Sequence, residues 1–287
     1  MYLWCEVSHR ENVFRPGKLI SMPAIHPPRL KIQADELVQN ASHPEVFCRS
    51  YHQFLDSYAD RTFRPGKVGE PPPLLRAYQV PKPVSRAVDK QLGVWAGENR
   101  ADALNLADAL WLQPILEFRL TAASLIGKID PLPVKHIFSR VETWIQPGTE
   151  ERLVKALINK GLERVLVETQ DRYVKQVETW LRSRSYERNR LGLKASYPLM
   201  EQRDFEDYPM LFMLLTRLML AQQKPLRSEI LRVLEEMARI IPGETAFFLE
   251  NTLKSSGHNT QIAWYLRNSL DYFPDETRSQ LREILAG

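Results

Sequence analysis

The chain of 287 residues has few cysteines and few glycines, and it lacks any long apolar run. Its two cysteines, Cys5 and Cys48, have no CxxC spacing, which argues against a disulfide scaffold and a cysteine-rich zinc site. Only twelve glycines are present, and neither a Gly-x-Gly-x-x-Gly nor a Gly-Lys-Ser/Thr loop occurs, so no nucleotide-binding loop is evident. The most apolar stretch, 210–220, is interrupted by Thr216 and Arg217 and falls short of the roughly 18–20 residues of a membrane helix.

The six histidines lack the close pairing that is typical of a metal site, so the sequence predicts neither a metal nor a cofactor. The first thirty residues carry charged side chains and no apolar run of signal-peptide length. We therefore expect a cytoplasmic protein with no membrane partner. The start of the chain leaves one alternative open, because Met22 is a second candidate for the first translated residue.

Prolines divide the chain unevenly, since eleven of the twenty lie in residues 1–83. Residues 1–30 show no regular apolar period and contain several prolines, so we predict an irregular tail there. Residues 31–287 are then expected to form a single domain. Within it, a helical hairpin over about 33–62 is separated from the rest by a Pro- and Gly-rich break at 64–73.

From residue 74 onward the apolar residues follow helical spacing, and no window alternates as a strand does. Proline-containing breaks divide this region into helices of ordinary length, and one of these breaks is expected at Pro198. The pattern predicts an all-α fold.

Tryptophans recur at a spacing of 33 to 36 residues, at Trp111, Trp144 and Trp180. A glutamate and an Arg-Leu pair follow each of them at similar distances, and Val-Glu-Thr-Trp occurs twice. This period is typical of stacked helical hairpins, and it predicts a right-handed α-solenoid of HEAT-like repeats. We expect the tryptophans to pack between layers, and for Trp144 a position lining a groove is left open.

Positive charge is concentrated in residues 152–190, which contain ten basic and five acidic residues, a net of +5. The remainder of the chain carries 29 basic and 30 acidic residues, a net of −1. Arginines gathered around one inter-helix turn suit phosphate contacts, although an ordinary solvated rim is an equally good interpretation. The predicted nucleic-acid contacts are Arg152, Lys155, Arg182, Arg184, Tyr186, Arg188, Arg190 and Lys194.

Two segments carry a family pattern, Ala-Leu-Trp-Leu-Gln-Pro-Ile-Leu-Glu-Phe-Arg at 109–119 and the stretch from Trp180 to Arg190. They resemble the bacterial DNA alkylation repair glycosylases that are built of HEAT-like repeats, and the resemblance covers about residues 45–200. It implies duplex DNA as the partner and excision of alkylated bases as the family activity.

The catalytic pattern of that family is altered in this chain, which resembles a divergent member. The family carries Trp-Asp-x-Val-Asp, and the matching stretch reads Glu-Arg-Leu-Val-Lys, so Lys155 replaces the catalytic carboxylate and Glu151 replaces an aromatic residue. The family's arginine falls at Asn189, and residues 244–248 occupy the region of a late Lys-x-Ile-Gly-Trp motif. A lysine near a developing oxocarbenium ion raises the energy of the transition state.

Three functions are compatible with the sequence. The first is a DNA-binding protein that holds duplex backbone in a basic concave groove through phosphates and shape. The second is an active alkylpurine glycosylase with a relocated carboxylate, for which Glu151 is the candidate. The third is a scaffold that binds a partner protein.

Overall fold

The computed structural model describes residues 26–60, 75–221 and 224–286, and these are helical almost throughout. The one strand-like pairing among the described residues is an isolated bridge between Arg76 and Ile115. The all-α fold expected from the apolar periodicity is therefore confirmed.

The helices of the N-terminal half are short to medium in length. They are α1 (Pro27–Val38), α2 (Pro44–Tyr58), α3 (Lys82–Glu98), α4 (Arg100–Leu112), α5 (Leu116–Ile126), α6 (Lys135–Trp144) and α7 (Glu151–Ala156).

After α7 the chain forms a π-helical segment, and helices then continue to the end of the described residues. The elements are η1 (Leu157–Gly161), α8 (Glu163–Glu168), α9 (Gln170–Arg182), α10 (Tyr186–Met200), α11 (Tyr208–Leu220), η2 (Lys224–Leu226), α12 (Arg227–Ile240), α13 (Pro242–Ser255), α14 (Thr260–Ser269), η3 (Leu270–Tyr272) and α15 (Asp275–Ala286).

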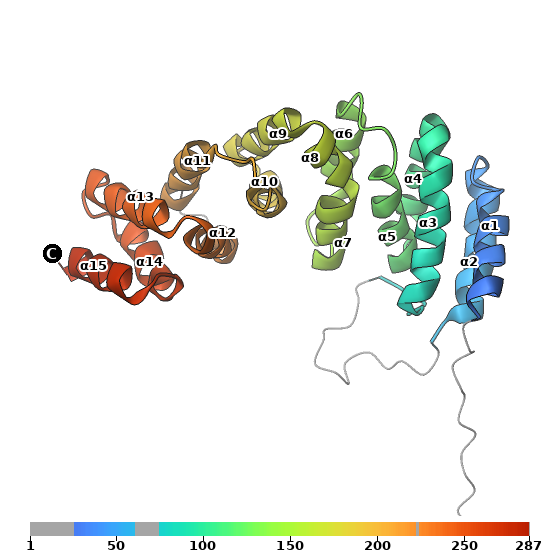
Figure 1. The fold of residues 1–287 in the computed structure, drawn as a ribbon, viewed down its shortest axis with the longest axis horizontal. Helices are drawn as coiled ribbons and strands as arrows, with labels where there is room; N and C mark the ends of the chain where they lie inside the picture. The colour runs from blue at the N-terminus through green and yellow to red at the C-terminus, as the bar shows by residue number, and fades with distance from the viewer. Residues whose placement is uncertain (1–25, 61–74, 222–223, 287) are drawn as a thin grey trace, which may run out of the picture.

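These helices stack side by side into an arch, with the earliest helices at one end and α15 at the other (Figure 1). The helices α10 and α12 lie on the inner side of the arch, whereas α9 and α11 lie on its outer side (Figure 1). The inner helices touch in series, because α5 packs against α7 and η1, η1 packs against α10, and α10 packs against α12. The candidate site described below lies on these inner helices.

The tryptophans that recur in the sequence lie between successive helices of the arch. Trp111 at the end of α4 and Trp144 at the end of α6 are only 7% and 8% exposed. Their rings stack with centroids 4.6 Å apart and an angle of 7° between the planes. Trp180 is fully buried and meets Phe138 edge-on at 5.7 Å. The expected packing between layers is confirmed, and Trp144 belongs to the same core.

Two expectations about proline were wrong. Helix α1 begins at Pro27, three residues before the predicted end of the tail, because a proline in the first helical turn has no N–H bond to lose. Pro198 does not end a helix but lies inside α10, which continues to Met200. Since only two residues follow it, the missing N–H removes a bond from the last turn alone. The rest of the predicted tail, with Met22, and the predicted break at 64–73 fall in ranges outside the described residues.

The π-helical segment η1 packs closely against the end of α5. A Cβ atom added to Gly127 would lie 1.8 Å from the carbonyl oxygen of Lys160, so the two backbones touch directly. Short π-helical segments inside α-helices are frequent at functional sites. Here the segment interrupts the helix that supplies one wall of the site described below.

In the part of the chain that the structure describes, no helix combines the length and the apolar character required to cross a membrane.

Candidate functional site

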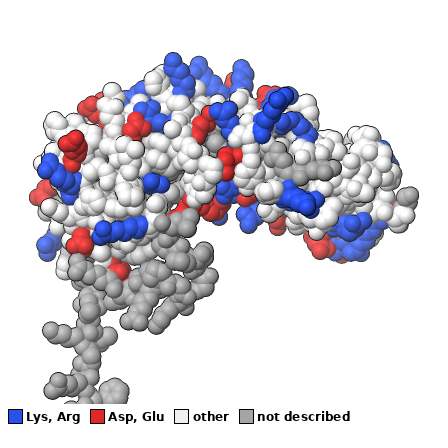
Figure 2. Space-filling model, turned by 180° about the vertical axis from the view of Figure 1, so that it is seen from behind, with Lys and Arg blue, Asp and Glu red and all other residues white. Residues whose placement is uncertain are grey.

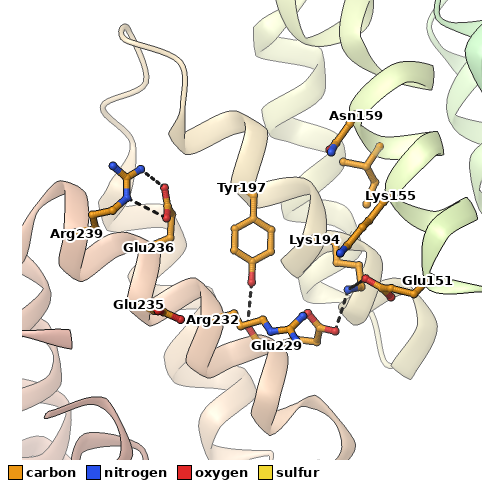
Figure 3. A pocket seen from close by; sticks show the side chains of 11 residues that line it. Glu151, Lys155, Asn159, Lys194, Tyr197, Glu229, Arg232, Glu235, Glu236 and Arg239 are labelled. Carbon is orange, nitrogen blue, oxygen red and sulfur yellow. Dashed lines mark hydrogen bonds and ion pairs between the residues drawn. The ribbon is translucent and has the colours of Figure 1, made fainter. Parts of the chain in front are cut away.

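A pocket with a volume of about 530 Å³ opens on the inner side of the arch between α7, α10 and α12 (Figure 3). Its volume lies within the range of ligand-binding pockets in proteins. Most of the side chains around it are charged. The lining residues are Glu151, Lys155, Ile158, Asn159, Lys194, Tyr197, Glu229, Arg232, Glu235, Glu236 and Arg239.

The α7 wall presents three polar side chains on one helix face. Glu151 is the first residue of α7, Lys155 follows one turn later, and Asn159 lies in η1 after another turn. Residues four apart share a face of a helix, so all three line the pocket. The family resemblance had matched Glu151 and Lys155 to the two ends of the catalytic motif, and both line this pocket.

Two cations on α10 bind the carboxylate of Glu151. Lys194 Nζ lies 2.6 Å from Glu151 Oε1, and Arg190 Nη2 lies 2.7 Å from Glu151 Oε2. Each carboxylate oxygen thus accepts a charge-assisted hydrogen bond, which fixes the orientation of the group. The same Lys194 Nζ lies 2.9 Å from Glu229 Oε1 on α12. With a side chain only 6% exposed, Lys194 connects all three walls.

The surroundings of Glu151 favour its ionised form. Burial by itself raises the pKa of this carboxyl, but the hydrogen bond from Lys194 and the charges of Lys194, Arg190 and Lys155 outweigh burial and lower it below its ordinary value. The pocket therefore contains a carboxylate that is oriented and anionic at neutral pH.

The α12 wall adds a row of acidic and basic side chains (Figure 3). Arg239 Nε donates to Glu236 Oε2 at 3.2 Å, so these two charges neutralise each other at the pocket rim. Glu229 is buried, and its Oε2 has no hydrogen-bond partner among the described residues. Burial, followed by the charge of Glu229, raises the pKa of Tyr197, so this phenol stays neutral. Sequence reasoning missed this wall and Tyr197.

The pocket as a whole carries no net charge, because four carboxylates face four cations. The acidic members are Glu151, Glu229, Glu235 and Glu236, and the basic members are Lys155, Lys194, Arg232 and Arg239. Seen from behind, basic and acidic side chains are also interspersed over the described surface (Figure 2). The positive excess of residues 152–190 is therefore not gathered inside this pocket.

Four of the predicted phosphate contacts form ion pairs with nearby carboxylates. Arg190 and Lys194 hold Glu151, and Lys194 is buried, so neither presents a free charge to solvent. Arg188 Nη2 lies 3.0 Å from Glu142 Oε2, and Arg182 pairs with Glu178 one turn away at 2.9 Å. Of these four, Arg182 and Arg188 remain exposed.

The other predicted contacts are exposed side chains. Arg152, Lys155 and Arg184 are exposed and form no ion pair with any residue that the structure describes. Tyr186, the first residue of α10, is 37% exposed. Together with Arg184 it lies at the turn between α9 and α10, whose N-cap residue Ser185 accepts a hydrogen bond from the Arg188 backbone N–H. The structure thus brings Arg184, Tyr186 and Arg188 together at one turn.

Asn189, which stands where the resembling family has an arginine, has a structural role. It is fully buried, and with its amide nitrogen facing α9 it donates to the carbonyl oxygens of Trp180, Leu181 and Ser183 at 3.0–3.1 Å. The last carbonyl groups of a helix lack partners within that helix, and Asn189 supplies them for α9. This residue lies outside the pocket lining.

Residues 244–248 also lie outside this pocket, in α13. Phe248 stacks on Phe212 with ring centroids 4.5 Å apart, and Phe247 is exposed. Among the described residues, no three His, Cys, Asp or Glu side chains are close enough together to hold a metal ion. The chemistry that the described pocket offers is that of a fixed carboxylate, a lysine amine and a neutral phenol.

Two comparisons with known proteins bear on this geometry. The model of the family described as DNA alkylation repair enzyme matches residues 75–273, which include every residue that lines the pocket. No curated protein matches the chain at a significant level.

Proposed function

The chain belongs to the DNA alkylation repair enzyme family, and from this membership we propose that it is a right-handed HEAT-like α-solenoid that holds duplex DNA along the inner side of its arch. The family match covers more than half of the chain and supports a function connected with DNA repair. In this proposal the DNA backbone lies across the ends of α7 and α10, and a nucleotide faces the pocket between them.

The observation that carries the proposal is the set of exposed cations at the N-terminal ends of α7 and α10. Arg152 and Arg184 are exposed and unpaired among the described residues, and Arg188 is exposed although paired with Glu142. Exposed guanidinium groups bind phosphate oxygens bidentately and position a duplex without reading its sequence. The exposed ring of Tyr186, between Arg184 and Arg188 in sequence, is available to stack on a sugar or base.

Ion pairing sets the expected strength of this binding. Arg190 pairs with Glu151 and Glu187, and Lys194 pairs with Glu151 and Glu229. We therefore treat these two cations as part of the scaffold and assign phosphate contacts to Arg152, Arg184 and Arg188. Each phosphate contact contributes about −0.9 to the slope of log affinity against log salt. With three such contacts we expect a shallow slope of log affinity against log salt, about three times this value.

A salt series of duplex binding tests the proposal. The double variant Arg184→Glu, Arg188→Glu is expected to bind duplex much more weakly and with a flatter slope than the parent protein. The charge-matched control Arg29→Glu, Lys31→Glu changes two exposed cations in α1, at the far end of the arch, and is expected to bind almost normally. If both double variants bind duplex DNA with equal affinity, Arg184 and Arg188 are not phosphate contacts.

Base excision is a second candidate function, and the anionic Glu151 in the pocket favours it. A fixed carboxylate stabilises the positive charge that develops on the sugar as an alkylated base departs. The two cations that hold Glu151 weaken this field, which argues for slow excision. Release of 7-methylguanine from duplex DNA, abolished by Glu151→Gln, would establish this activity, and absence of release would leave a binding protein.

A further inference from the structure

The two lysines of the pocket differ in their surroundings. The Lys194 amine is buried between Glu151 and Glu229, and its hydrogens are engaged by both carboxylates. Lys155 is exposed, lines the same pocket, and forms no ion pair with any residue in the described ranges. Its side chain extends from α7 toward Lys194 and the centre of the pocket (Figure 3). Lys155 is therefore the lysine amine of the pocket that is accessible to a ligand.

We propose that Lys155 is a nucleophile that attacks the aldehyde of an abasic deoxyribose in DNA and cleaves the strand on its 3′ side. This inference rests on the proposed binding of duplex DNA at the inner side of the arch. An accessible lysine amine and a carbonyl substrate form an imine, as in other lysine-dependent covalent catalysis.

The reaction requires no oxidant, reductant or additional cofactor. The lone pair of the Lys155 amine, in its neutral form, bonds to C1′ of the ring-opened sugar. The C1′ oxygen takes one proton from the amine and one from solvent and leaves as water, which gives a protonated imine. A proton then passes from C2′ to solvent, and its electron pair forms the C2′–C3′ double bond. The bond between C3′ and its oxygen breaks, and the 3′ phosphate departs with the electron pair. Water finally hydrolyses the imine and restores the amine.

The neighbours of Lys155 suit this chemistry. Glu151 lies one helical turn before Lys155 on the same face, and its lowered pKa keeps it anionic beside the cationic imine. Lys194 and Arg190 fix the orientation of that carboxylate without occupying Lys155. An abasic nucleotide also leaves the pocket free of a base, so the sugar can approach the α7 wall.

Borohydride trapping tests the inference, because it reduces the imine to a stable bond between protein and DNA. The full-length protein is incubated with a duplex that contains one aldehydic abasic site, and sodium borohydride is added. We expect a covalent adduct that peptide mapping places on Lys155, and strand cleavage when borohydride is left out. Lys155→Arg keeps the positive charge but has no amine nucleophile, and it is expected to lose both products. Lys160→Ala removes an exposed lysine of η1 that pairs with Asp89, and it should retain both.

A second duplex separates failure of this inference from failure of DNA binding. Its abasic site is a tetrahydrofuran analogue, which has the same shape but no aldehyde, and binding to it is measured for every variant. Binding of the parent protein without any trapped adduct would overturn the lysine assignment and leave the proposed function standing. Absence of binding would remove both. Trapping that persists in Lys155→Arg at equal bound fraction would also overturn the assignment.

Discussion

Lys194 Nζ on α10 lies 2.9 Å from Glu229 Oε1 on α12, and this ion pair is buried inside the wall of the pocket. The same amine lies 2.6 Å from Glu151 on α7, so one lysine connects three successive inner helices of the arch. A buried ion pair contributes little by itself when compared with apolar packing, but removing one partner leaves a charge without compensation.

Replacement of this lysine is therefore expected to destabilise the fold. Lys194→Met keeps much of the side-chain volume but leaves Glu229 buried without a counter-charge, and we expect a loss of about 3–5 kcal/mol in the free energy of unfolding. Arg182→Met is the control, because its exposed pair with Glu178 on the same helix is worth only about 0.3–0.5 kcal/mol. Urea denaturation at neutral pH measures both. Similar midpoints for the two variants would contradict a structural role for the buried lysine.

The ionisation of Glu151 predicts a pH dependence of stability. Its pKa in the folded protein lies below the ordinary value of 4.5. As the pH falls, the Glu151 carboxylate therefore takes up a proton in the unfolded chain before it does so in the folded chain. The stability that this carboxylate contributes is complete above its ordinary pKa and is lost as the pH falls through the folded-state pKa. Glu151→Gln is expected to be less stable than the parent near neutral pH, and the difference should shrink in acid. A difference that stays constant from neutral to acidic pH would contradict the assignment.

The close approach of Gly127 to η1 predicts opposite effects at two glycines. Gly127→Ala places a methyl group 1.8 Å from the Lys160 carbonyl oxygen, so the backbone of α5 or η1 must move and the protein is expected to lose stability. Gly97→Ala near the end of α3 meets no atom within 4 Å, and alanine is favoured over glycine in helices by about 0.5–1 kcal/mol. Thermal unfolding should therefore give a lower midpoint for the first variant and an equal or higher one for the second. The reverse order would show that η1 is displaced easily.

The all-α class was predictable because its signal is local in sequence. Helical spacing of apolar residues depends on neighbours within a few turns. The recurrent Trp111, Trp144 and Trp180 are buried between helices as expected. The wrong expectation at Pro198 has a local cause as well. A proline at the end of a helix costs less than one in its centre, and the sequence alone did not show how close the end was.

The site was less predictable because its charges are paired across helices that are distant in sequence. Glu151 meets Lys194 across 43 residues, and Arg188 meets Glu142 across 46. A count of charges along the chain treats these arginines and lysines as free, whereas their partners in space neutralise them. The acidic residues of α12 that complete the pocket fall beyond the basic stretch, and no periodic signal connects them with Glu151.

The pair between Arg188 and Glu142 provides a last prediction, in which a loss of negative charge strengthens DNA binding. Glu142 Oε2 neutralises Arg188, while its Oε1 accepts hydrogen bonds from Trp180 Nε1 at 2.7 Å and Gln176 Nε2 at 2.9 Å. Glu142→Gln retains an oxygen acceptor for these donors but removes the charge that competes with phosphate for Arg188. We expect tighter duplex binding and a steeper salt slope, with an increase of no more than about 0.9, the value for one complete phosphate contact.

The matched control for this change is Glu250→Gln, which frees Lys254 on α13 in the same way. Because Lys254 is not among the assigned phosphate contacts, this variant is expected to leave the salt slope nearly unchanged. If both variants steepen the slope equally, general charge explains the effect and Arg188 is not a specific contact. Tryptophan fluorescence checks that Glu142→Gln leaves the surroundings of Trp180 intact. If the fluorescence is unchanged and the affinity and the salt slope are also unchanged, Arg188 does not reach the DNA backbone. The path of the DNA must then lie away from the turn between α9 and α10.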